Sequence, residues 1–224
     1  MKQQHFFAIV ASFLSACLIA PASATLIAAT IKGTVTDGFD YVGAFGTANR
    51  SLTGMDFTAT YLFDTSIGGI QINTATQTLA QGGSSEGSAS PSLGATITIN
   101  GNSVAINGNF WAQISGLNDG IGYSQLNYAA QQFDGTSYTN FNHGVFANSM
   151  LFPSDINQPY SWNAFLGGTS YGFLTSNDIF ANRYNYLANM TNSSLVVTTV
   201  PEPSTMGLLG LGLVGLGFVR RKGA

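Results

Sequence analysis

Cysteine, histidine and charged residues are all scarce in this sequence, and each shortage excludes a class of site. The single cysteine is Cys17, close to the N-terminus, so a domain that follows it has neither a disulfide nor thiol chemistry. His143 is the only histidine after residue 24, which rules out zinc sites built from histidine and cysteine clusters. Charged residues are 8% of the chain, far below the usual quarter. The exposed surface must therefore consist largely of uncharged polar side chains.

Cations are the scarcest charges in the middle of the chain. Between Thr25 and Val200 there are three of them against nine acids, which gives a net charge of −6. The three are Lys32, Arg50 and Arg183, and they are scattered along the sequence. Nucleic-acid binding needs clustered cations, so we expect no nucleic-acid partner.

No catalytic constellation stands out among the remaining polar residues. His143 lies in a turn-like Asn-Phe-Asn-His-Gly stretch, and we interpret it as a satisfied turn or surface histidine rather than part of a catalytic triad. Gly83–Gly87 has the spelling of a nucleophile elbow, but it falls within residues 81–92, whose Ser- and Gly-rich composition predicts a flexible loop. We therefore predict a protein that is not an enzyme and has no cofactor.

The acidic residues are spread out, and most are expected to serve turns, because aspartate precedes glycine at positions 37, 119 and 134. Calcium needs only oxygen ligands on loops, and its first candidates would be Asp37, Asp40 and Asp64. No EF-hand or nonapeptide pattern accompanies them.

A glycosidase needs two carboxyls about 5–10 Å apart, which a fold can bring together from distant positions. That alternative stays open.

Aromatic residues accompany many Asn and Gln side chains, a combination that suits sugar faces and hydroxyl groups. Tyr160-Ser161-Trp162 and Tyr184-Asn185-Tyr186 each place two rings on one side of an extended strand. Either pair could form a platform for a sugar. The competing interpretation is that these rings pack the core, as large aromatic side chains commonly do.

The apolar pattern of the middle segment is that of β-strands. Apolar residues alternate with threonine over 55–63 and again over 95–100. Asn100-Gly101 and Asn107-Gly108 are strong tight-turn dipeptides. The alternation predicts a mainly β domain, residues 25–199, with an antiparallel β-sandwich or jelly-roll architecture. Shorter strands are expected over residues 30–36, 67–72, 104–106, 110–114, 123–128, 144–148, 170–174 and 195–200, and a short helix could lie within 177–188.

Residues 1–24 have the three parts of a secretory signal peptide and are expected to form its helix. Lys2 supplies the positive charge, Phe6–Ile19 the apolar segment, and Ala22-Ser23-Ala24 the small-residue cleavage site. Cleavage after Ala24 would begin the mature chain at residue 25. A lipobox-like sequence ending at Cys17 offers a rival cleavage site.

Residues 200–224 contain three features that follow one another along the chain. Pro201 and Pro203 disfavour helix in their neighbours, so the Pro-Glu-Pro signature is expected to be extended and exposed. Met206–Val219 contains no polar side chain and five glycines, which are common in membrane-spanning helices but destabilise water-soluble ones. The segment ends with three cations that resist translocation across a membrane: Arg220, Arg221 and Lys222.

The apolar segment is short for a membrane span. Fourteen residues rise about 21 Å as a helix, against a hydrocarbon core of about 30 Å. Length alone therefore favours a buried helix of a soluble domain, whereas glycine content and the terminal cations favour a transmembrane helix. Arginine side chains can snorkel to the interface and the bilayer can thin, so we predict a transmembrane helix here.

The order of Pro201-Glu202-Pro203, an apolar run and the terminal cations Arg220, Arg221 and Lys222 resembles the PEP-CTERM sorting tail. Stretches such as 31–38 and 57–65 are more loosely similar to other PEP-CTERM proteins, which implies only a β-rich ectodomain. The resemblance of the tail implies a bacterial exported protein, anchored transiently in the inner membrane, processed near the signature by an exosortase and delivered to the cell surface.

From this resemblance and the lack of a catalytic pattern we expect a structural or adhesive protein of an exopolysaccharide matrix or biofilm. The alternative is a secreted carbohydrate-binding module, or a carbohydrate-active enzyme with an unrecognised carboxylate pair.

Overall fold

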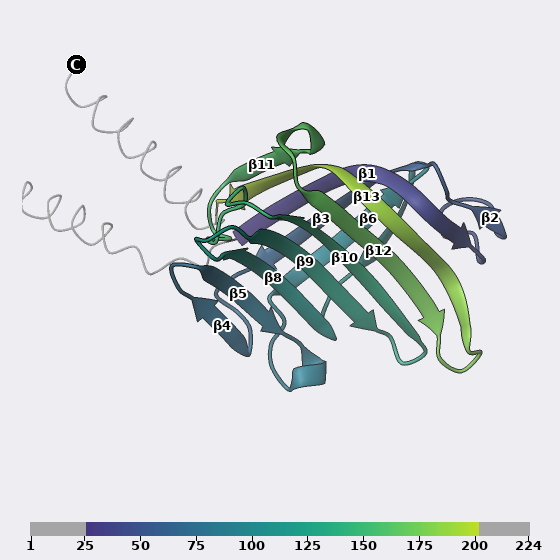
Figure 1. The fold of residues 1–224 in the computed structure, drawn as a ribbon. Helices are drawn as coiled ribbons and strands as arrows, with labels where there is room; N and C mark the ends of the chain where they lie inside the picture. The colour runs from purple at the N-terminus through teal and green to yellow at the C-terminus, as the bar shows by residue number, and fades with distance from the viewer. Residues whose placement is uncertain (1–25, 202–224) are drawn as a thin grey trace, which may run out of the picture. The chain divides into compact units, whose positions relative to one another are not determined.

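The computed structural model describes residues 26–201, which form an almost wholly antiparallel β structure (Figure 1). The strands are β1 (Leu26–Asp40), β2 (Arg50–Ser51), β3 (Asp56–Asp64), β4 (Ile70–Asn73), β5 (Gln77–Gly82), β6 (Ser92–Ile99), β7 (Asn102–Ile106), β8 (Trp111–Asn118), β9 (Ser124–Phe133), β10 (Ser137–Ala147), β11 (Tyr160–Asn163), β12 (Thr169–Asp178) and β13 (Arg183–Val200). The two helices of this region are single 3-10 turns, η1 (Ser84–Glu86) and η2 (Ala164–Leu166).

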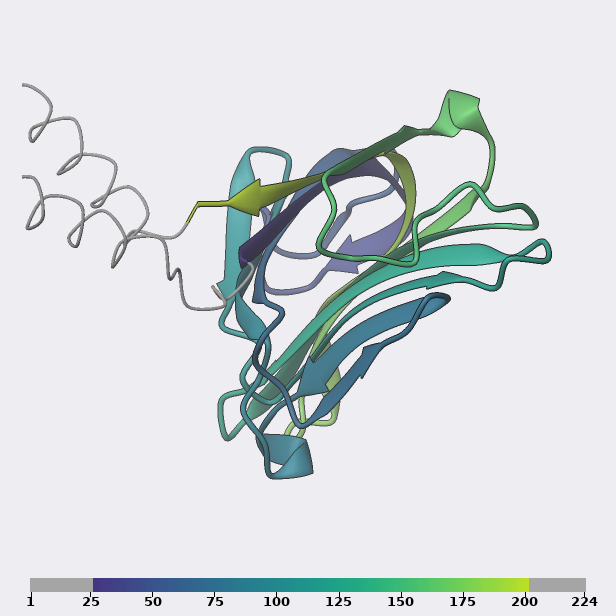
Figure 2. The same cartoon turned by 90° about the vertical axis from the view of Figure 1, so that its left-hand side faces the viewer.

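All these strands belong to one hydrogen-bonded sheet with the order β4-β5-β8-β9-β10-β12-β13-β1-β3-β6-β7. β11 pairs with the end of β13, and β2 pairs with the end of β1. The sheet curls so strongly that its two halves face each other, as Figure 2 shows. Tyr61 on β3 contacts Tyr128 on β9 and His143 on β10 across the interior. The core fills the space between the two halves.

The alternation in the sequence decides which face of each strand is buried. In β3, Phe57, Ala59, Tyr61 and Phe63 are all buried, while the residues between them are at least partly exposed. β6 follows the same pattern, and the Asn100-Gly101 turn joins it to β7 with both residues at positive φ, 53° and 78°. Asparagine and glycine tolerate that region, which gives the hairpin the twist that its strands need. The predicted alternation and this turn are confirmed.

The mainly β, antiparallel prediction is confirmed, with two corrections of detail. The strands form one continuous curled sheet instead of the two separate sheets of a sandwich. Residues 177–188 contain no helix, because β12 ends at Asp178 and β13 begins at Arg183. Cross-strand pairing of this hairpin outweighs its weak helical pattern.

No helix within residues 26–201 has the length and apolar character to cross a membrane. The predicted signal helix with Ala22 and Ala24, Cys17 and the predicted transmembrane helix lie outside the described residues. Glu202, Pro203, Arg220, Arg221 and Lys222 lie outside them too. Those predictions remain predictions.

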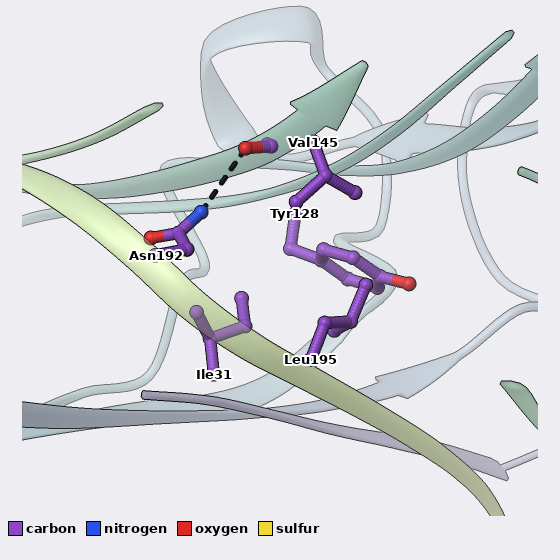
Figure 3. A pocket seen from close by; sticks show the side chains of 6 residues that line it. Ile31, Tyr128, Val145, Asn192 and Leu195 are labelled. Carbon is purple, nitrogen blue, oxygen red and sulfur yellow. Dashed lines mark hydrogen bonds between the residues drawn. The ribbon is translucent and has the colours of Figure 1, made fainter. Parts of the chain in front are cut away.

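β13 changes partners along its length, and a buried asparagine makes this possible. Its first half pairs with β12 as far as Met190, and its second half pairs with β11 from residue 194. Between them lies Asn192, which is labelled in Figure 3 and is only 1% exposed. Its Nδ2 donates to the backbone oxygens of Gly144 and Tyr171, both at 3.0 Å, so the side chain ties β13 to β10 and β12 at this point.

Candidate functional site

His143 lies in the centre of the core. The prediction of a turn or surface histidine is wrong: the residue is on β10 and is 0% exposed. Its Nδ1 shares a hydrogen bond of 2.6 Å with the Tyr61 hydroxyl, and its Nε2 has no partner within the described region. Its Cδ2 lies so close to Gly172 that a Cβ there would sit 2.5 Å away. Tight packing encloses the imidazole on that side.

Burial controls the ionisation of this pair. Loss of hydration lowers the pKa of His143 to about 3, and burial raises the pKa of Tyr61 well above its ordinary value. Both groups are therefore neutral at physiological pH. The pair lies inside the core, where it stabilises the packing of β3 against β10.

The acidic residues mostly bind the backbone of their own turns. Side-chain oxygens of five aspartates accept hydrogen bonds from backbone N–H groups two to four residues later: Asp64, Asp119, Asp134, Asp155 and Asp178. These bonds lower the pKa of Asp119 and of Asp134. The predicted turn role is confirmed at Asp119 and Asp134, but it is wrong at Asp37, which lies within β1 and pairs with Asn189 of β13.

The calcium candidates do not come together. Asp64 pairs with Leu26 at the start of β1, whereas Asp37 and Asp40 lie at the far end of the same strand. Within residues 26–201 no three carboxylate, histidine or cysteine side chains are grouped closely enough to hold a metal ion.

Asp40 has a different role, because it organises the loop that follows β1. The residue is buried, and its Oδ2 accepts a 2.7 Å hydrogen bond from the backbone N–H of Phe45. Its Oδ1 accepts from three consecutive backbone N–H groups, those of Val42 at 3.2 Å, Gly43 at 2.8 Å and Ala44 at 3.1 Å. One carboxylate therefore holds the whole loop in a single conformation.

Of the two interpretations left open for Tyr160 and Trp162, a sugar platform or core packing, the structure supports core packing. Trp162 is buried and donates from Nε1 to the Gly167 oxygen at 2.8 Å. The Tyr160 hydroxyl donates to the Leu151 oxygen at 3.1 Å, and both rings pack edge-on against Phe152. These aromatic residues belong to the core.

A β-bulge separates the second pair of rings. Ser176 and Asn177 of β12 pair with Tyr186 and Tyr184 of β13, so Asn185 is an extra residue. The bulge turns Tyr186 inward, where it packs edge-on against Phe45 at 5.3 Å between ring centroids, and leaves Tyr184 51% exposed. The two rings therefore do not form a shared platform on this strand.

Tyr184 instead lines a surface hollow together with a ring from another part of the chain. A surface hollow of about 480 Å³ is lined by Tyr41, Val42, Asn49, Arg183 and Tyr184. We call it the Tyr41–Tyr184 hollow. Tyr41 is 43% exposed, and its backbone N–H donates to the Asn185 oxygen at 2.9 Å, which ties the Asp40 loop to the bulge. Sequence reasoning singled out Tyr184 but missed Tyr41, because only the β1–β13 pairing brings the two loops together.

The end of β13 connects directly to the C-terminal segment. Val200 pairs with Leu26, so the first and last strands of the described region finish side by side. Pro201, the first residue of the Pro-Glu-Pro signature, follows without a linker and is exposed, as predicted. The family model of the PEP-CTERM protein-sorting motif matches residues 199–222.

The chain carries a PEP-CTERM sorting motif. This motif implies a protein that is exported, processed by an exosortase, which is a membrane enzyme, and sorted to the cell surface. The match extends from the last residues of β13 through Lys222 and so includes Glu202, Pro203, Arg220 and Arg221. No curated protein and no solved structure matches the chain.

Proposed function

We propose that this PEP-CTERM protein is a structural or adhesive, non-enzymatic component of an extracellular polysaccharide matrix. The tail holds it transiently in the inner membrane until processing releases the β-rich domain. The observation that carries the proposal is the position of the sorting motif, which begins in the last residues of β13 with no intervening linker. A single folded unit is thereby delivered to the cell surface.

The construction of the domain supports a load-bearing or adhesive role. β1 and β13 are paired over nearly their full lengths, from Leu26 with Val200 to Asp40 with Tyr186. The two ends of the domain are therefore fastened to each other by backbone hydrogen bonds.

The alternative function is a secreted carbohydrate-binding module. One observation favours it: two exposed tyrosines, Tyr41 and Tyr184, line the same surface hollow. A binding module would have sugar binding as its only function, whereas an adhesive matrix protein would also have a structural role. A carbohydrate-active enzyme would additionally need a pair of carboxylates facing each other across that sugar.

Removing residues 201–224 will change where the protein is found. We expect the wild-type chain in the washed extracellular matrix, with a C-terminus near Pro201 and an N-terminus at Thr25. The truncated chain lacks the processing signal, so we expect most of it to be lost from the matrix and surface fractions. The measurement is cell fractionation with sequencing of both termini.

A chain with Arg220, Arg221 and Lys222 all changed to glutamine is the matched control for the tail, since it keeps the signature and the apolar segment. It should be processed less efficiently than wild type but more than the truncated chain. Recovery of wild-type protein with an intact tail from the extracellular fraction would contradict processing. Wild-type protein that washes freely out of the matrix would contradict the structural role.

A further inference from the structure

The Tyr41–Tyr184 hollow combines two aromatic rings with a cation, Arg183, that has no ion pair within residues 26–201. We propose that it binds a carboxylated pyranose, a uronic acid unit of an acidic polysaccharide. This inference rests on the proposed matrix function, for which it names the ligand class and the binding residues.

The rings supply the apolar part of the site. Tyr41 and Tyr184 are about half exposed, and the exposed side chain of Val42 lines the same hollow. Tyr41 also packs against Phe39 with 4.7 Å between ring centroids, which limits its rotation. A pyranose presents an apolar face of C–H groups and an edge of hydroxyls, and tyrosine matches both.

Arg183 supplies the charge that selects an acidic sugar. Its guanidinium has no ion pair and no side-chain hydrogen bond within residues 26–201. The nearest acid along the ladder is Asp178, which pairs with Arg183 in register, but its Oδ1 accepts from the backbone N–H groups of Phe180 and Ala181. Asp40 is likewise occupied by four backbone N–H groups. A planar guanidinium without an internal partner suits bidentate binding of a carboxylate.

The frame of the hollow is fixed before any ligand arrives. Asp40 holds one wall through the backbone of its loop, and the bulge at Asn185 holds the other. The Tyr41 N–H to Asn185 oxygen bond joins the two walls. Asn49, in the left-handed region with φ of 58°, closes the rim with a side-chain amide that can bond a hydroxyl. Because the residues of a preformed site are already ordered, binding a ligand there costs less conformational entropy.

The test measures binding of full-length protein in mild detergent to two six-unit oligosaccharides, an oligogalacturonate and neutral cellohexaose, by titration calorimetry. We expect the oligouronate to bind at least tenfold more tightly at low salt, with the advantage shrinking as salt rises. Arg183→Gln should weaken oligouronate binding at least tenfold and leave cellohexaose nearly unchanged. Tyr184→Ala should weaken binding of both.

Two variants serve as controls. Lys32→Gln removes an exposed cation from the middle of β1, and Phe165→Ala removes a fully exposed ring from η2, so neither should change binding. Equal binding of both sugars, or an Arg183→Gln variant that binds the oligouronate normally, would overturn the inference. Purified protein is used, so this outcome is separate from sorting: a protein that stays in the matrix but fails this test retains its proposed function and loses only the proposed site.

Discussion

Lowering the pH from 7 to 5 is expected to reduce the free energy of unfolding by about 2 kcal/mol, with His143 as the cause. The imidazole is enclosed in the core and its pKa in the folded protein is about 3, whereas an exposed histidine titrates near 6.5. Protonation in the folded state would place an unpaired charge between Tyr61 and Gly172. The folded state therefore binds this proton only in strong acid.

The direction follows from which state binds the proton. Below about pH 6.5 the unfolded chain takes up a proton on His143 and the folded chain does not, so unfolding is favoured as the pH falls. The stability contributed by the neutral histidine is fully present above pH 6.5. It is lost progressively between pH 6.5 and about 3, with a limiting slope of about 1.4 kcal/mol per pH unit.

Between pH 7 and 5 the acids with lowered pKa values do not interfere. The pKa values of Asp119 and Asp134 lie below the ordinary 3.8 in the folded state, so their contributions to stability are lost only below about pH 5. His143 is also the only histidine in the described region, which makes its ring signals simple to follow by NMR. Urea unfolding at several pH values between 7 and 5 gives the slope directly.

His143→Gln is the matched control, because glutamine offers the Tyr61 hydroxyl a polar partner but cannot titrate. We expect this variant to be less stable than wild type at pH 7 and to show a nearly flat stability between pH 7 and 5. A wild-type protein without the slope, or a glutamine variant that keeps it, would show that the histidine is not the buried group responsible.

Replacing Asp40 with alanine is expected to cost about 3 kcal/mol of stability and to abolish sugar binding at the Tyr41–Tyr184 hollow. Four backbone N–H groups lose their acceptor together, and the Phe45 group is buried. Hydrogen bonds to a charged group contribute about 1.5–3 kcal/mol each, but water replaces some of the lost acceptors at the part-buried positions. The loop then no longer holds Tyr41 opposite Tyr184.

Denaturant unfolding measures the first effect, and oligouronate titration at a temperature where the variant remains folded measures the second. Asp37→Ala is the control, since Asp37 is an exposed acid on the same strand. Its stability should stay within about 0.5 kcal/mol of wild type. An Asp40→Ala variant as stable as the Asp37→Ala control would refute the assigned role of the carboxylate.

Local patterns predicted the strands well, because the alternation or turn dipeptide that marks each strand lies within or next to that strand. Alternation over 55–63 and 95–100 marks the buried faces of β3 and β6, and Asn100-Gly101 marks the hairpin between β6 and β7. The same reasoning failed for 177–188. A weak helical pattern there lost to strand pairing on both sides of β13: with β12 in a local hairpin, and with β1, which is far away in the sequence.

The candidate site was less predictable, for two separate physical reasons. Strand alternation placed Tyr184 and Tyr186 on one face, but the bulge at Asn185 moved them to opposite faces. Asp40 was singled out for its oxygen atoms, yet those atoms accept hydrogen bonds from the backbone N–H groups of residues 42–45. Both the bulge and these bonds are local in sequence, but neither leaves a mark in the apolar–polar pattern on which the prediction was based.

The sequence alone determined where this protein goes and what kind of domain it contains. A sorting motif works as a linear signal, so it can be recognised from local sequence alone. Alternating apolar and polar side chains likewise predict a strand without knowledge of its partners. Tertiary structure decided the rest: that His143 is buried against Tyr61, and that Tyr41 and Tyr184 share one hollow. Both facts arise from contacts between residues more than eighty positions apart, and the free energy of such contacts depends on the packing of the whole sheet.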